Sequence, residues 1–176
     1  MTTYINIFGG PGVGKSTLAA SLFAEMKRAG MSVELVTEVA KDFVWEERFE
    51  TLKNQLYIVS KQYRNLVRVK DKVDYVITDA PIINGCIYND LYDGGLPQSY
   101  NDMIIDLHNQ VLTPSINICV GREFEYDTAG RYQTLEQAVQ VDNLVSQWLK
   151  YIQANVIYTN NFTLTDLKKS LTINGE

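Results

Sequence analysis

The sequence predicts an α/β protein in which a parallel sheet is covered by helices on both faces. Short apolar runs of strand type alternate with longer segments whose apolar residues recur at helical spacing. Several runs are continuously apolar, which is typical of strands that are buried on both faces. With 176 residues, 45% of them hydrophobic, the chain is long enough for one core and short for two domains. We therefore expect one domain over residues 1–176 with five parallel strands.

The first elements are a strand over residues 4–8 and a helix from about residue 15 to 29, joined by a glycine-rich loop. Gly30 is a natural left-handed stop for this helix. A second strand follows over residues 32–37. The apolar stripe of the helix comprises Leu18, Ala19, Leu22, Phe23 and Met26.

The middle of the chain predicts two helices around a third strand. Residues 51–69 form a long helical pattern, and residues 75–78 form a strand of the continuous apolar type. Ser99 and Asp102 resemble a capping box for the next helix, which must end before Pro114. The residues expected to face inward from this helix are Met103, Ile104, Leu107 and Val111.

The last third predicts a strand over residues 116–120, a polar loop over 121–133, a helix over 134–152 and a strand over 155–158. Residues 165–171 are expected to form a short closing helix, with frayed residues after it. The helix over 134–152 is expected to bury Leu135, Ala138, Val141, Val145, Trp148 and Leu149.

A phosphate-binding motif lies between the first strand and the first helix. Residues 9–17 read Gly-Gly-Pro-Gly-Val-Gly-Lys-Ser-Thr and fill every fixed position of G-x-x-x-x-G-K-[ST]. The glycines let successive N–H groups converge on one anion, Lys15 neutralises the outer phosphates, and Ser16 offers a hydroxyl to Mg²⁺. The alternative is a chance glycine-rich turn, but such a turn would not need a strand directly before it and a helix directly after it. The expected nucleotide-binding residues are Gly10, Gly12, Val13, Gly14, Lys15, Ser16 and Thr17.

Asp79 ends the third strand, where a phosphate-loop protein needs a carboxylate near the metal. We therefore expect Ser16 and Asp79 to hold Mg²⁺; the alternative is an ordinary strand-to-loop aspartate. Ala80 and Pro81 follow, so the glutamate that many ATP-driven motors place after this aspartate is missing. The Asn-Lys-x-Asp run that reads guanine in GTPases is also missing. Both absences favour transfer to an acceptor over hydrolysis.

Glu38 ends the second strand, at the same edge of the sheet as Asp79. A carboxylate there could accept the proton of an attacking hydroxyl. The alternative is a glutamate that favours the N-terminus of a following helix by its charge. Asp42 could share this site. Phe43 and Trp45 could form an apolar wall for a flat base, or pack in the core.

The polar loop over residues 121–133 carries Arg122, Arg131 and Gln133. An arginine on such a loop can close over the transferring phosphate and neutralise its charge, and Arg131 is the preferred candidate. The alternative is a solvated surface loop. Lys61, Arg64 and Arg68 form a basic helical stripe that either holds acceptor phosphates or is merely solvated.

Composition excludes several other functions. A net charge of −5 argues against a large nonspecific nucleic-acid surface. Cys86 and Cys119 form no metal or disulfide pattern, and His108 has no ligand partners at metal spacing. No apolar stretch approaches the length of a membrane span, so we expect a cytoplasmic protein without a membrane partner. The oligomeric state is left open.

With the phosphate loop, Glu38, Thr-Asp-Ala-Pro at 78–81 and Gly-Arg-Tyr-Gln-Thr at 130–134, the chain resembles nucleoside and nucleotide kinase-like P-loop proteins. More narrowly, it is similar to the AAA-annotated P-loop proteins of bacteriophages, which are related to the nicotinamide-riboside kinase domain. That group includes kinases that phosphorylate 5-hydroxymethyluracil in viral DNA during thymidine hypermodification, and the run Glu-Val-Ala-Lys-Asp at 38–42 fits them.

The resemblance implies a three-layer P-loop NTPase fold with sheet order 2-3-1-4-5. It also implies that Lys15 and Ser16 hold ATP and Mg²⁺, that Glu38 or Asp79 acts as the base, and that Arg131 belongs to the lid. The expected function is ATP- and Mg²⁺-dependent transfer of the γ-phosphate to a nucleoside-like acceptor, in its sharpest form the hydroxymethyl group of 5-hydroxymethyluracil in phage DNA. The alternatives are a free nucleotide or nucleoside kinase, and an NTP-hydrolysing switch or motor subunit.

Overall fold

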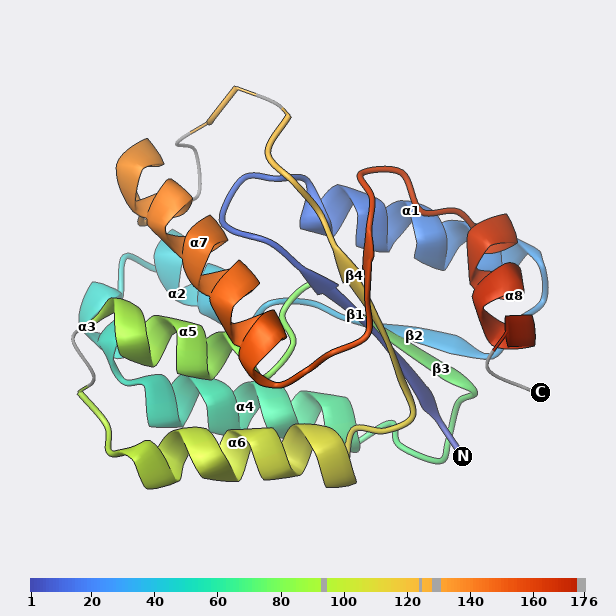
Figure 1. Cartoon of the computed structure of the whole chain (residues 1–176), viewed down its shortest axis with the longest axis horizontal. Coiled ribbons are helices and arrows are strands. Elements are labelled where there is room, and N and C mark those ends of the chain that lie inside the picture. The colour runs from blue at the N-terminus through green and yellow to red at the C-terminus, as the bar shows by residue number, and fades with distance from the viewer. Residues whose placement is uncertain (93–94, 124, 128–130, 174–176) are drawn as a thin grey trace.

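Five parallel strands form one sheet in the order β2-β3-β1-β4-β5 (Figure 1). The computed structural model describes residues 1–92, 95–123, 125–127 and 131–173. The sheet order is the one that the kinase resemblance implied, and the three-layer α/β class is confirmed. The strands are β1 (Thr3–Phe8), β2 (Val33–Val36), β3 (Tyr75–Thr78), β4 (Ser115–Cys119) and β5 (Val156–Tyr158).

Helices cover both faces of the sheet, as side chains that alternate along each strand require. In β1, Tyr4 and Phe8 belong to the core under the helices from α4 to α7, whereas Ile5 and Ile7 belong to the core under α1 and α8. The helices are α1 (Lys15–Arg28), α2 (Ala40–Trp45), α3 (Phe49–Lys53), α4 (Gln55–Val67), α5 (Asn84–Leu91), α6 (Gln98–Gln110), α7 (Leu135–Tyr151) and α8 (Leu164–Ile173).

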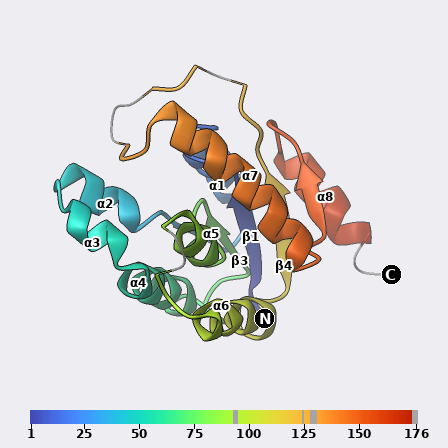
Figure 2. The ribbon, with the colours of Figure 1, turned by 60° about the vertical axis from the view of Figure 1, so that its left-hand side comes forward.

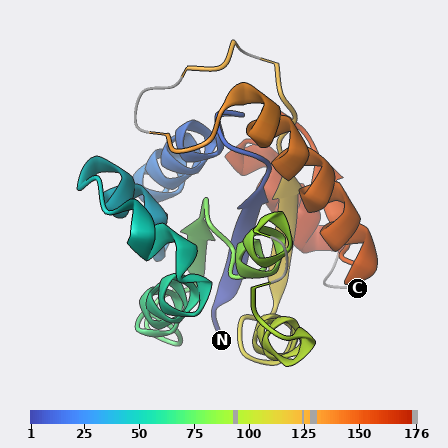
Figure 3. The same cartoon turned by 90° about the vertical axis from the view of Figure 1, so that its left-hand side faces the viewer.

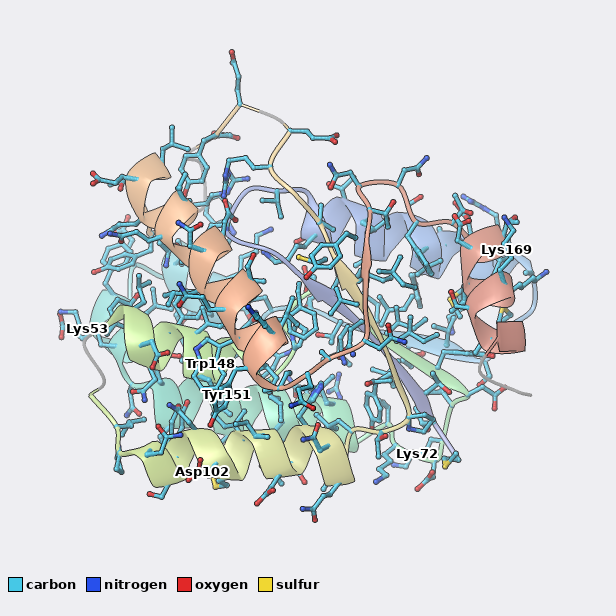
Figure 4. The ribbon with its side chains drawn as sticks, in the orientation of Figure 1. Lys53, Lys72, Asp102, Trp148, Tyr151 and Lys169 are labelled. Atoms are coloured by element: carbon cyan, nitrogen blue, oxygen red, sulfur yellow. The ribbon has the colours of Figure 1, made fainter. Side chains whose placement is uncertain are left out.

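Helix α5 lies between the other helices on its face of the sheet. Figures 2 and 3 both show α2 and α3 on one side of α5 and α7 on the other. Trp148 of α7 donates a hydrogen bond from its ring nitrogen to the Asp90 carboxylate of α5 at 2.7 Å, and packs edge to face against Tyr151 (Figure 4). The hydrogen bond thus joins α7 to α5.

The predicted helices differ from the structure in three respects. The helix expected over residues 51–69 is two helices, because Asn54 interrupts it and caps α4 by accepting the N–H of Tyr57. The short helices α2 and α5 were not predicted. Ser99 is not a cap: α6 begins at Gln98, after Pro97.

Some predicted core positions also face outward. Met103 is 43% exposed and Leu135 is 51% exposed, because each lies at the margin of its apolar stripe. The N-terminus of α7 instead has a capping box that was not predicted, in which Thr134 and Gln137 each bond the other's backbone N–H.

Among the described residues, no helix is both long enough and apolar enough to span a membrane.

Candidate functional site

The phosphate loop curls at the carboxyl end of β1 because its glycines adopt conformations that other residues avoid. Gly12 and Gly14 have φ values of 81° and 95°, in the left-handed region. Gly14 immediately precedes α1, so the first N–H groups of the helix point into the loop. Together these features build an anion site that needs no cationic side chain for its shape.

Lys15 is the first residue of α1 and borders a cavity in front of the loop. Its ammonium group donates a hydrogen bond to the Gly10 carbonyl at 2.8 Å. Burial lowers the pKa of Lys15, while the carboxylates of Glu38, Asp79 and Asp142 act in the opposite direction. The lysine is therefore held at the loop by surrounding negative charge.

Ser16 and Asp79 meet across the ends of β1 and β3. The Ser16 hydroxyl donates to Oδ2 of Asp79 at 2.5 Å. Asp79 is buried, and its other oxygen, Oδ1, has no hydrogen-bond partner in the described part of the chain. A buried carboxylate oxygen that lacks a donor fits a hard cation. This pair, predicted from sequence, thus has the donor set that Mg²⁺ prefers.

Glu38 follows β2 and borders the same cavity. Burial raises the pKa of its carboxyl group, Asp79 raises it further, and Lys15 and Lys41 lower it. The adjacent backbone is fixed by Gln62 of α4, whose side-chain oxygen accepts the N–H of Val39 at 3.1 Å. Glu38 therefore borders the same cavity as Lys15 of the phosphate loop, from the end of a strand that β3 separates from β1.

Sequence reasoning missed Asp142, although it contacts the phosphate loop directly. Its Oδ1 accepts the N–H of Gly10 at 2.9 Å, and its Oδ2 pairs with Nε of Arg122 at 2.9 Å. Arg122 in turn donates from Nη2 to the carbonyl of Pro11 at 2.8 Å. Arg122 thus braces the back of the loop. It is not among the described residues that line the cavity.

Arg131 lies on the other side of the loop and lines the cavity. A Cβ built on Gly12 would come within 2.8 Å of its Nη1, which shows how closely the guanidinium group approaches the loop. Its guanidinium group also packs over the Tyr126 ring, 5.0 Å from the centroid, and donates to the carbonyl of Asp127. Residues 124 and 128–130 of this loop, including Gly130, lie outside the described residues.

One continuous cavity of about 290 Å³ opens in front of these groups. The phosphate loop borders it through Gly12, Gly14, Lys15, Ser16 and Thr17. Helices α3, α4 and α5 also border it, and we call the lining from this side the helical wall. The helical wall includes Leu52, Gln55, Gln62, Asn84, Tyr88 and Tyr92.

Gln133 also lines the cavity, whereas the candidates that follow are not among its lining residues. Val13 is buried under the loop in the core beneath α1, and Gly10 faces Asp142. Asp42 and Trp45 are exposed, and Phe43 is packed in a small core with Val39 and Leu52. Of the basic stripe, Lys61 lies over the rings of Phe43 and Tyr57.

Two comparisons with known proteins agree with this architecture. A family model described as an AAA domain matches residues 4–164. Thymidylate kinase from Ehrlichia chaffeensis aligns with a TM-score of 0.63 and 19% identity, covering 98% of this chain and 99% of that one.

Deoxyadenosine kinase from M. mycoides was aligned in two states. With the products dCMP and a flexible dCDP bound, it gives a TM-score of 0.59 and 18% identity, covering 98% of this chain and 100% of that one. With bound dATP, it gives a TM-score of 0.59 and 19% identity, covering 98% and 99%. At these identities the likeness shows a shared fold. A sequence search of curated proteins finds no match.

Proposed function

We propose that this chain, which belongs to the AAA domain family, is a phosphotransferase that moves the γ-phosphate of ATP to a nucleoside-like acceptor. One observation carries the proposal: the cavity that borders the phosphate loop and Glu38 is also lined by the helical wall of α3, α4 and α5. A hydrolase needs room only for water, whereas this site has room for a second substrate beside the donor phosphate.

The donor end has the groups that phosphate transfer requires. The N–H groups of the loop and the ammonium of Lys15 would bind the β- and γ-phosphates. Ser16 and Asp79 would hold Mg²⁺, which neutralises charge on the donor phosphates when bound. Arg131, which lies against Gly12, would stabilise the charge of the transferring phosphoryl group and help exclude water.

Glu38 would serve as the general base. It lines the same cavity as the phosphate loop and the helical wall, so an acceptor bound against that wall would place its nucleophile near this carboxylate. Asp79 already accepts a hydrogen bond from Ser16, which suits it to metal binding more than to proton removal. We therefore assign the base to Glu38.

A finer proposal concerns the acceptor itself. The sequence resemblance favours the hydroxymethyl group of 5-hydroxymethyluracil in DNA, in which case the base must leave the duplex stack to enter the cavity. Lys61 and the exposed Trp45 lie on the outer helices beside this cavity and could contact a strand. Because the donor is ATP, we expect the protein to work in the cytoplasm, that of the host cell if it is phage-encoded.

The decisive test uses ATP labelled on the γ-phosphate, Mg²⁺ and separate acceptor panels. The panels are free nucleosides, nucleoside monophosphates, DNA containing 5-hydroxymethyluracil, and the same DNA containing thymine. We expect labelled product that depends on an acceptor. Transfer to hydroxymethyluracil DNA but not to thymine DNA would support the finer proposal. Robust ATP hydrolysis without any labelled product would instead indicate a switch or motor subunit.

A further inference from the structure

The two carboxylates of the site lie beyond the ends of their strands. The hydrogen-bonded ladder between β2 and β3 ends at the pair Val36 and Thr78. Asp79 is the next residue after β3, whereas Glu38 lies two residues after β2. The charge of Asp79 raises the pKa of Glu38, so the two groups are close. The ladder itself therefore does not set the position of Glu38 relative to Asp79.

Gln62 of α4 joins the two segments that carry these carboxylates. Its side-chain oxygen accepts the N–H of Val39, the residue after Glu38, at 3.1 Å. Its side-chain nitrogen donates to Oγ1 of Thr78, the residue before Asp79, at 3.4 Å. The amide must have this orientation, because a backbone N–H can only donate and therefore faces the oxygen. Gln62 thus links the backbone beside one carboxylate to the strand beside the other.

This link is buried, and it continues past Asp79. Gln62 is 4% exposed, and Thr78 is completely buried. Oγ1 of Thr78 also accepts the N–H of Ala80 at 3.1 Å, so this hydrogen bond fixes the turn that contains Asp79. Loss of the Gln62 amide would leave the N–H of Val39 without its acceptor in a buried place, which is costly. The amide therefore holds the two segments in one arrangement.

We propose that Gln62 is a positioning residue, which sets where Glu38 lies relative to Asp79 and so where the base lies relative to the metal. The proposal rests on the proposed function, in which Glu38 accepts a proton and Asp79 holds Mg²⁺. Gln62 also borders the cavity, so the alternative is that it binds the acceptor directly. The two roles differ in their kinetics. Misplacing a base lowers kcat, whereas losing a binding contact raises the KM of the acceptor.

The first test is Gln62→Met, which keeps the length of the side chain but removes its amide. With labelled ATP, Mg²⁺ and the best acceptor, we expect kcat to fall about 10- to 100-fold and both KM values to change less than about threefold.

The matched control for this variant is Asn89→Leu. Asn89 is also a buried amide, and it forms hydrogen bonds with both backbone groups of Leu96. It is not among the described residues that line the cavity. Asn89→Leu should therefore lower the stability of the fold, measured by thermal melting, and keep kcat. An equal loss of kcat in Asn89→Leu and Gln62→Met would overturn the inference.

A double-mutant cycle with Glu38→Gln tests whether Gln62 acts through Glu38. The base is already lost in that background, so Gln62→Met should change kcat there by less than about threefold. An undiminished effect in that background would overturn the inference, as would a rise in the KM of the acceptor with kcat unchanged. If Gln62→Met is too unstable to assay, Thr78→Val breaks the same link at its other end and should show the same dependence on Glu38.

Amide hydrogen exchange at Val39, followed by NMR, tests the link without turnover. Gln62→Met should speed this exchange more than Asn89→Leu does, because the N–H loses its buried acceptor. Equal exchange in the two variants would overturn the inference and leave the proposed function intact. Absence of transfer to every acceptor by the unmodified protein, with ATP still hydrolysed, would instead overturn the proposed function itself.

Discussion

The carboxylate of Asp142 on α7 accepts the backbone N–H of Gly10 in the phosphate loop at 2.9 Å, across 132 residues of sequence. A Cβ on Gly10 would collide with this carboxylate and come within 2.9 Å of the Ala138 carbonyl, so only glycine allows the approach. The other carboxylate oxygen pairs with Arg122, whose second contact is the carbonyl of Pro11. The loop is therefore braced from outside the cavity at two consecutive residues.

Replacing Asp142 should weaken ATP binding. Asp142→Ala removes both contacts and leaves Arg122 without its ion pair. Because hydrogen bonds to charged groups contribute about 1.5–3 kcal/mol, we expect about a 10- to 100-fold loss of affinity. Asp142→Asn retains an oxygen for Gly10 and should lose less. Calorimetric titration with ATP measures both.

The control is Glu136→Gln, which removes an exposed negative charge from the same helix. It should bind ATP as the unmodified protein does. If Asp142→Ala also binds ATP normally, the brace does not position the loop.

Lys15→Ala should abolish phosphate transfer. Lys15 is the cation closest to the expected position of the outer phosphates, and loss of one such group from a preorganised site costs about 100- to 1,000-fold in kcat. Steady-state transfer to the best acceptor measures the effect. Lys27→Ala is the matched control, because Lys27 lies on the same helix in an exposed pair with Glu34. Equal loss in both variants would contradict a specific role for Lys15.

Glu38→Gln should slow transfer by about 100- to 10,000-fold and leave ATP affinity nearly unchanged, as expected for loss of a general base. Burial raises the pKa of Glu38, and only the ionised form can accept a proton. The kcat of the unmodified protein should therefore rise with pH through that raised pKa, and the profile of the variant should lose this limb.

Glu34→Gln serves as the control, since Glu34 lies on β2 in an exposed ion pair with Lys27. It should keep both the rate and the pH profile. A Glu38→Gln variant that turns over normally would show that the base assignment is wrong.

The strands and the phosphate loop could be predicted because their signals are local. The third strand has the predicted bounds, since Tyr75–Thr78 is buried on both faces and is continuously apolar. Helix α5 could not be predicted in this way. It packs between α4 and α7, so Gly85, Cys86 and Asn89 are all buried and no single stripe appears in its sequence.

In the site, the residues at motif positions and strand ends could likewise be predicted from local signals. Lys15, Ser16, Glu38 and Asp79 each occupy a strand end or a motif position, and parallel strand ends converge at one edge of the sheet. Asp142 occupies a polar position within an ordinary amphipathic helix, and its role depends on how α7 packs against the loop. Arg122 was considered as a group that closes over the phosphate, but its contacts place it behind the loop.

The stability of the fold should fall on mild acidification because of His108. This residue of α6 is 5% exposed, and its Nδ1 has no hydrogen-bond partner in the described part of the chain. Burial lowers its pKa from 6.5 to about 4, so the unfolded chain binds a proton that the folded chain resists. The stability associated with the neutral imidazole is fully present above pH 6.5 and is lost as the pH falls toward 4. The full effect is about 3 kcal/mol.

Urea unfolding of the unmodified protein and of His108→Leu, at several pH values between 7 and 4, isolates this contribution. Carboxylates that titrate in the same range are common to both proteins and cancel in the difference. The free energy of unfolding of the unmodified protein should fall by about 3 kcal/mol more than that of the variant over this range. Parallel curves would show that His108 takes up its proton in the folded state at an ordinary pKa, and that the interior around α6 admits water.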